Sequence, residues 1–320
     1  MNRAMWCVIG FVIGSGVLLP LMFATATDNT VINGATADEV RLGKATFRIQ
    51  SRGAAPDVGL QGVRDWVLRS AGIVSAYFGE FPVKAVSIRV STTDSSSMGS
   101  GRTYGYPRPR IEVNVGQHIS LPSLNDDWVL IHEMSHLSLP AIDESHAWLA
   151  EGVAVYVEGV ARAQAGNISE TRLWGEYETS IPKGLPGLND QGLDRTHTWA
   201  RTYWGGALYC LLADIRIREK TKNRRGLQDA LRAIAQAGGG MSEEWPIERI
   251  LSVGDAATAT SVMTDLYLKM KDQPFAPDLD TLWLDLGIQI NFGIVSFDDT
   301  ARLAAVRRAI THKPADHATL

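Results

Sequence analysis

The sequence is 320 residues long, with 45% hydrophobic and 21% charged residues and a formal net charge of −4. This length suffices for one large domain or two ordinary ones, and the composition is that of an ordinary globular protein. A weakly negative chain without blocks of like charge, and without any RNA- or DNA-binding motif, excludes nucleic acid as an expected partner.

The N-terminal segment differs in composition from the rest of the chain. Arg3 is the only charged residue before Asp28, and the apolar run ends at Ala24-Thr25-Ala26. This A-x-A pattern predicts a signal peptide over residues 1–26. The alternative is an uncleaved membrane tether, because residues 4–27 are long enough to span a bilayer. Both alternatives predict an exported chain that acts in a periplasm or outside the cell.

The next third of the chain contains mostly strand patterns. After a polar stretch around residues 28–44, apolar residues at helical spacing predict a helix at residues 59–79. Alternating patterns predict four short strands, at residues 45–50, 84–91, 97–105 and 110–116. Residues 99–106 are expected to form an edge strand on which an extended peptide pairs, with a plain hairpin as the alternative.

From Asp126 onward the patterns are mostly helical. Helices are predicted at residues 127–139, 145–164, 199–221, 226–240, 246–253, 256–271, 278–286 and 298–310. A sheet-bearing part followed by a helical part predicts an α+β fold. Cys7 would be lost with a signal peptide, so the mature chain would have no internal disulfide. Because Cys210 lies in the apolar run "GALYCLLADI", it is expected to be a core residue.

The sequence "HEMSH" at residues 132–136 is the first candidate site. Residues four apart on a helix share one face, so His132 and His136 can direct two imidazoles at one zinc ion. Glu133 is offset from them by about 100° and can reach a water molecule at the metal without binding the metal itself. This pattern predicts a zinc site in which Glu133 lies within reach of the water at the metal.

Glu151, in "WLAEG", is the candidate for the third zinc ligand. It follows a break at Pro140 and falls early in the next predicted helix, among apolar residues. Glutamate is rarely buried in such surroundings unless it is paired, and zinc bound by the two histidines would be a suitable partner. The alternative is an ordinary glutamate on a helix surface.

Together, "HEMSH" and "WLAEGVAVYVE" resemble the gluzincin metallopeptidases of the MA clan, and they are most similar to the glycyl-aminopeptidase family and its relatives. The resemblance covers roughly residues 100–235. It implies that His132, His136 and Glu151 bind one Zn²⁺ and that Glu133 is the general base. The implied activity is that of an exported zinc metallopeptidase acting on a peptide or protein.

The same resemblance implies two parts of the mature chain. Residues 40–165 would form a zincin-like α+β part that carries both motifs, and residues 166–320 would form a helical part that completes the active-site cleft. The polar segment 166–197 is expected to be a loop that covers the site. The sequence predicts no particular oligomeric state.

The strand upstream of the first histidine departs from the family pattern. Aminopeptidase members carry a glutamate there that binds the substrate's free amine, whereas "GSGRTYGY" has no acidic residue and offers Arg102 instead. This favours an endopeptidase, or a substrate with a carboxylate near the cleavage point. An aminopeptidase of the same clan is the first alternative. A non-catalytic, zinc-stabilised binding module of the cell envelope is the second, and the presence of Glu133 argues against it.

The resemblance also suggests a donor for the oxyanion. Tyr203, in "RTYWGG", is the first candidate, with a core aromatic residue as the alternative, and His197 is the second candidate. Glu158 is expected either to accept a hydrogen bond from a ligating histidine or to be a solvated helix residue. His118 and His146 are expected to be structural or surface residues, and Tyr156 to be a packing residue.

Overall fold

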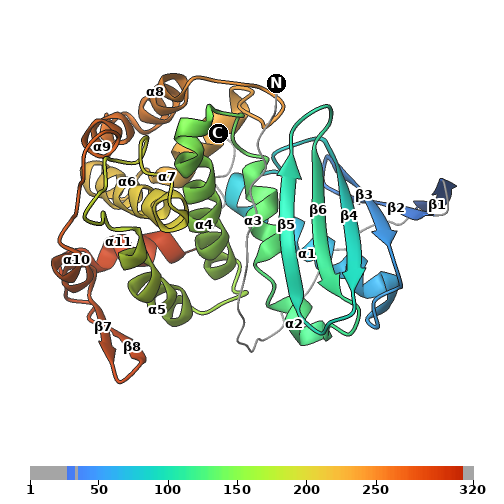
Figure 1. Cartoon of the computed structure of the whole chain (residues 1–320). Coiled ribbons are helices and arrows are strands. Elements are labelled where there is room, and N and C mark those ends of the chain that lie inside the picture. Colours follow the sequence, from blue (N-terminus) through green and yellow to red (C-terminus); the bar gives the residue numbers. More distant parts are fainter. Residues whose placement is uncertain (1–26, 33–34, 313–320) are drawn as a thin grey trace. The chain divides into compact units, whose positions relative to one another are not determined.

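The computed structural model describes residues 27–32 and 35–312. These residues form a mixed sheet with helices, followed by a mainly helical part, and this confirms the expected α+β fold (Figure 1). The predicted signal peptide, residues 1–26, lies outside the described residues. Within the described ranges, no helix combines the length and the apolar composition that crossing a membrane requires.

The chain divides into two compact units. The first unit comprises the chain up to Ala141 together with Gly240–Glu243. The second comprises Ile142–Gly239 and the chain from Glu244 onward. The first unit therefore contains "HEMSH", and the second contains "WLAEG". The functional division expected near residue 165 stays a prediction.

A six-stranded sheet forms the centre of the first unit, in the order β1-β2-β3-β4-β6-β5. Its strands are β1 (Thr27–Ile32), β2 (Ala35–Leu42), β3 (Ala45–Arg52), β4 (Ala85–Thr93), β5 (Met98–Tyr104) and β6 (Arg110–Gly116). β4 is parallel to both β3 and β6, and the other pairs are antiparallel. The four predicted strands are confirmed, β5 lies at the edge as expected, and the sequence patterns missed β1 and β2.

Alternation along the strands gives the sheet one buried face. Phe47 of β3, Ile88 of β4 and Ile111 of β6 are fully buried on this face, while the residues next to each of them along its strand are more exposed. Helix α1 (Gly59–Phe78) lies behind the sheet in Figure 1 and buries Trp66 and Val67. Two shorter helices, α2 (Leu121–Asn125) and α3 (Val129–His136), complete this unit.

The second unit consists mostly of helices. They are η1 (Glu144–His146), α4 (Ala147–Gln164), α5 (Glu170–Ser180), η2 (Ile181–Gly184), η3 (Arg201–Gly205), α6 (Gly206–Thr221), α7 (Leu227–Gln236), α8 (Ile247–Thr258), α9 (Val262–Met270), α10 (Leu279–Leu286) and α11 (Ala304–Thr311). η1 and η2 are 3₁₀ helices, and η3 is one turn of π-helix. The predicted helices are present with shifted ends. Cys210 is fully buried in α6, as expected.

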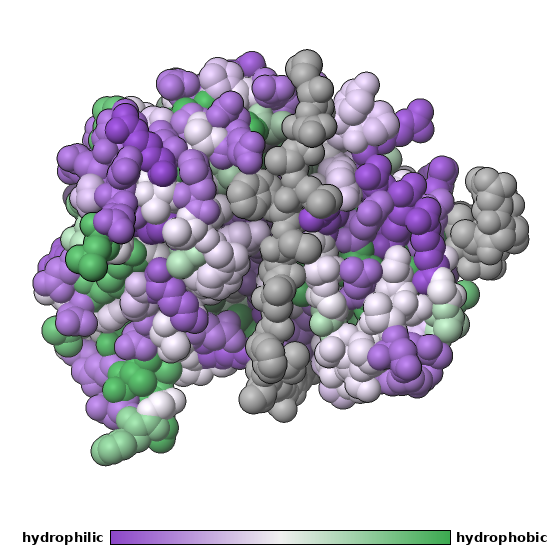
Figure 2. Space-filling view, in the orientation of Figure 1, coloured by the Kyte–Doolittle hydropathy of each residue, from purple (hydrophilic) through white to green (hydrophobic). Residues whose placement is uncertain are grey.

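Two predictions for the second unit were incomplete. The segment 166–197 is not only a loop, because it contains α5, whose start is capped by Ser169 and which buries Leu173 and Trp174. A hairpin of β7 (Ile288–Asn291) and β8 (Ile294–Phe297) was also missed. Figure 2 shows apolar side chains at the end of this hairpin, where Phe292 and Ile294 are exposed.

Candidate metal centre

Asp127 fixes the start of helix α3, which carries "HEMSH". Its two carboxylate oxygens accept hydrogen bonds from the main-chain N–H groups of Val129, at 2.8 Å, and Leu130, at 3.0 Å. The indole N–H of Trp66 donates a further bond, at 2.9 Å, to the same carboxylate. The carboxylate therefore caps α3 and joins it to α1, which determines where the histidine-bearing helix begins.

His132 and His136 lie one turn apart on α3, as the spacing predicts. Their ring centroids are 4.9 Å apart, and the ring planes are nearly perpendicular. His132 is buried and His136 is half-buried. The ring of Trp128 also lies edge-on to His132, with the two ring centroids 6.0 Å apart. The first unit thus presents two imidazoles on one side of the helix, and these are ligands that zinc commonly binds.

Glu133 lies against edge strand β5 and is buried. The hydroxyl of Thr103 is 2.7 Å from Glu133 Oε2 and 2.8 Å from the main-chain oxygen of Glu133. A Cβ atom at Gly101 would come within 2.5 Å of Glu133 Cγ, so only a glycine leaves room for this side chain. Our sequence predictions missed Thr103, although strand alternation from Gly101 places both residues on the same face.

Arg102 is on the other face of β5. It pairs in register with Glu112 of β6, whose carboxylate lies 2.9 Å from Arg89 and 3.0 Å from Arg110. Because side chains alternate along a strand, Arg102 points away from the face that carries Thr103. The expectation that Arg102 stands in place of the family's amine-binding glutamate, and so favours a substrate carboxylate, has no support from this geometry.

In the second unit, Glu151 is half-buried in the first turns of α4. The next residue, Gly152, packs directly on the backbone of Gly206 at the start of α6. A Cβ atom on Gly206 would in turn overlap the main-chain oxygen of Trp148. The two glycines let α4 and α6 meet backbone to backbone, which fixes the part of α4 that carries Glu151.

Tyr203 lies in the π-helical turn η3 and is buried, with its ring stacked on Trp199 at 5.7 Å. A buried ion pair holds this turn, because Arg201 Nε is 2.6 Å from Asp190 Oδ2. Single π-helical turns are often found at functional sites. His197 is exposed in the segment before η3. The assignment of Tyr203 or His197 as oxyanion donor stays a prediction.

The remaining candidates have other partners. Arg162 lies 2.7 Å from the carboxylate of Glu158, one turn along α4. His146 is hydrogen-bonded to Asp194 at 3.0 Å, in keeping with its expected structural role. The hydroxyl of Tyr156 donates to Asp214 at 2.7 Å within the core, as expected for a packing residue. His118 is a surface residue, as its side chain is half exposed.

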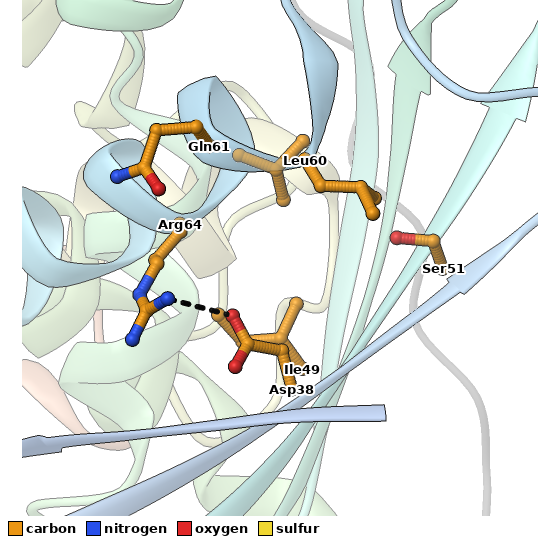
Figure 3. A pocket seen from close by; sticks show the side chains of 7 residues that line it. Asp38, Ile49, Ser51, Leu60, Gln61 and Arg64 are labelled. Atoms are coloured by element: carbon orange, nitrogen blue, oxygen red, sulfur yellow. Dashed lines mark ion pairs between the residues drawn. The ribbon is translucent and has the colours of Figure 1, made fainter. Parts of the chain in front are cut away.

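A small pocket of about 160 Å³ lies elsewhere in the first unit (Figure 3). It contains an ion pair in which Arg64 lies 3.5 Å from Asp38. None of the predicted site residues lines it; the lining residues are Asp38, Ile49, Ser51, Leu60, Gln61, Val63 and Arg64. This pocket therefore does not belong to the candidate metal centre.

No family model matches the sequence, and no curated protein matches it. Solved structures do share the fold. An aminopeptidase N family protein from Idiomarina loihiensis has a TM-score of 0.57 and 12% identity, over 80% of this chain and 50% of that one. A mutant of a two-domain M1 zinc metallopeptidase bound to L-arginine has a TM-score of 0.50 and 15% identity, over 80% of this chain and 61% of that one. The chain thus spans about half to three fifths of the length of these structures, and the likeness shows the fold.

Proposed function

We propose that the chain is a zinc-dependent metallopeptidase in which His132, His136 and Glu151 bind one zinc ion. The observation that carries this proposal is that α3 presents the imidazoles of His132 and His136 on one side, with ring centroids 4.9 Å apart, directly beside the buried carboxylate of Glu133. Two imidazoles and one carboxylate are a ligand set of catalytic zinc sites, which keep a fourth position for water or substrate. A structural site would more often use cysteines and four protein ligands.

The residues of the chain then have distinct roles in peptide hydrolysis. Zinc, when bound, supplies a Lewis acid for the scissile carbonyl and the attacking water. Glu133 takes a proton from that water as it attacks, and then gives the proton to the leaving amine. Tyr203, or His197 in its place, donates a hydrogen bond to the oxyanion. Glu133 is buried against β5, and this supports its role, because a base must be held at a fixed place.

Two kinds of peptidase activity are candidates, and each has one supporting observation. The names of the similar structures, an aminopeptidase N family protein and an M1 zinc metallopeptidase, favour an aminopeptidase. The face of β5 beside Glu133 carries Gly101 and Thr103, neither of which could bind a free amine as a carboxylate does, and this favours an endopeptidase. Matched peptides with free and acetylated N-termini distinguish the two, because an aminopeptidase needs the free amine.

We also propose that the chain is exported. The support is the composition of the N-terminal segment, an apolar run that ends in Ala24-Thr25-Ala26. N-terminal sequencing of the protein recovered from cell fractions tests this. A start at residue 27 in the exported fraction indicates a cleaved signal peptide, and an intact N-terminus in the membrane fraction indicates a tether. Recovery of the whole protein in the cytoplasm would contradict export.

The central test measures zinc content and peptide cleavage with the full chain, comparing the wild type with Glu133→Ala and Glu151→Gln. We expect one zinc ion in the wild type and in Glu133→Ala, and cleavage by the wild type alone. Glu151→Gln should lose most of its zinc, because an amide is a much poorer zinc ligand than a carboxylate. The matched control is Glu80→Ala, which removes an exposed carboxylate paired with Lys44.

The outcomes separate the proposed enzyme from the binding module. Zinc in the wild type without cleavage of any peptide would favour the non-catalytic alternative. Absence of zinc from the wild type would contradict the assignment of all three ligands. Equal cleavage by the wild type and Glu133→Ala would leave the zinc site but contradict the role of Glu133 as base.

A further inference from the structure

We propose that Thr103 is a positioning residue that holds the carboxylate of Glu133 in place for proton transfer, a role that rests on the proposed peptidase function. The hydroxyl of Thr103 lies between two oxygens of the same residue, Oε2 at 2.7 Å and the main-chain oxygen at 2.8 Å. The hydroxyl has one proton to donate, so it shares that proton between the side chain and the backbone of the same glutamate. A hydrogen bond to an ionised carboxylate is among the stronger ones in proteins.

The neighbouring glycine completes this arrangement. Gly101 and Thr103 pair with Val113 and Ile111 of β6, two buried residues, and so both face the inside of the first unit. A Cβ atom at Gly101 would lie 2.5 Å from Glu133 Cγ and 2.8 Å from Oε1. Edge strand β5 thus supplies space at one position and a hydroxyl two residues later. The space at Gly101 lets the glutamate adopt this conformation, and the hydroxyl of Thr103 is hydrogen-bonded to its carboxylate.

The consequence for the reaction follows from the flexibility of glutamate. A glutamate side chain has several rotatable bonds, and ordering it is entropically unfavourable. A general base is effective only when it lies within hydrogen-bond reach of the proton that it removes. With Oε2 held by Thr103, Oε1 is the oxygen that takes the proton from the attacking water. Thr103 touches neither substrate nor metal in this scheme and acts through Glu133 alone.

The first test measures whether the two side chains are coupled, using the metal-free full chain. Urea unfolding of the wild type, Thr103→Val, Glu133→Ala and the double variant forms a double-mutant cycle. We expect Thr103→Val to reduce the folding equilibrium constant about tenfold more in the wild type than in the Glu133→Ala background. The matched control is Thr46→Val, on the opposite face of the sheet, which should show no coupling. Zero coupling for Thr103 would overturn the proposal.

The second test measures kinetics and zinc content of the loaded enzyme. We expect Thr103→Val to lower kcat about 10- to 100-fold while KM and zinc content stay unchanged. Thr103→Ser keeps the hydroxyl and should recover kcat to within about threefold of the wild type. In the Glu133→Ala background, Thr103→Val should cause no additional loss of rate. An unchanged kcat in Thr103→Val, or a loss that serine does not restore, would overturn the positioning role.

The two tests separate failure of this proposal from failure of the proposed function. If zinc-loaded wild type cleaves no peptide, the peptidase function is wrong and Thr103 has no role in such a reaction, even if the unfolding cycle shows coupling. If the wild type cleaves peptides but the cycle shows no coupling, the peptidase function stands and the role of Thr103 is wrong. Coupling together with a serine-restored kcat supports both.

Discussion

The indole N–H of Trp66 donates a hydrogen bond to Asp127, 2.9 Å away, and both side chains are buried. This contact joins the long helix α1 to the first turn of α3. Arg69, one turn beyond Trp66 on α1, donates to the main-chain oxygen of Leu124. Burial lowers the pKa of the Arg69 guanidinium, and the negative charge of Asp127 opposes that shift. The beginning of the histidine-bearing helix is therefore held to α1 by the buried contact between Trp66 and Asp127, and Arg69 joins α1 to α2 beside it.

The first prediction concerns Asp127. Asp127→Ala removes two main-chain caps of α3 and leaves the buried Trp66 N–H without its acceptor, so we expect a loss of about 2–4 kcal/mol in the free energy of unfolding. Urea denaturation measures it. The matched control, Ser120→Ala, removes the exposed cap of α2 and should cost about 1 kcal/mol or less. Equal losses in the two variants would show that Asp127 is no more than a surface cap.

A second prediction concerns close packing by glycine in the second unit. Gly206→Ala should destabilise the protein by about 1–3 kcal/mol or more, because its new methyl group overlaps the backbone of Trp148 in α4. Gly72→Ala is the matched control in α1, where a Cβ atom meets nothing within 4 Å. That variant should stabilise the protein by about 0.5–1 kcal/mol. Thermal unfolding of the two variants should therefore shift in opposite directions from the wild type.

The third prediction concerns pH and the surface residue His118. Its ring nitrogens lie 2.9 Å from Asp57 and 3.4 Å from Asp94, and its pKa is raised, mainly by the hydrogen bond to Asp57 and then by the charge of that carboxylate. Because the folded state binds this proton more tightly than the unfolded state, the charged histidine stabilises the fold. The contribution is complete when the pH is below the unfolded pKa of about 6.5, and it is lost as the pH rises through the folded pKa.

The measurement compares wild type and His118→Gln by thermal unfolding across pH. The difference in Tm should be largest near about pH 5, where the histidine is charged and the carboxylates remain ionised, and should vanish at alkaline pH. In an NMR titration, Asp57→Asn should move the pKa of His118 downward. A difference in Tm that grows with pH would have the wrong sign for this pair.

The fourth prediction concerns the thiol of Cys210. This side chain is fully buried in α6, and burial raises the pKa of the thiol far above its usual range. Because the thiolate is the reactive form, a thiol reagent should not modify native Cys210 at neutral pH and should modify it quickly after unfolding. The Cys7→Ser variant isolates this signal. Rapid labelling of the native variant would mean that α6 opens readily.

Several features of the fold could be predicted from local patterns in the sequence. The strands β3, β4, β5 and β6 follow alternating residues, and α1 follows apolar residues at helical spacing, because both periods report one buried face. The i, i+4 spacing of His132 and His136 places them on a common side of α3, because residues four apart are neighbours on a helix surface. The polar patterns of β1, β2 and α5 gave weaker signals, and β7–β8 depends on positive φ angles at Phe292 and Gly293.

The sequence by itself therefore determined the helix that carries His132, Glu133 and His136, and the candidate ligand Glu151, because these depend on residue type and short-range spacing. Only the tertiary structure decided which residues support them. Thr103 stands thirty residues before Glu133 and Trp66 stands sixty-one before Asp127, yet each pair is hydrogen-bonded. Such contacts depend on how strands and helices pack, and a local period contains no information about the partner that packing brings to each side chain.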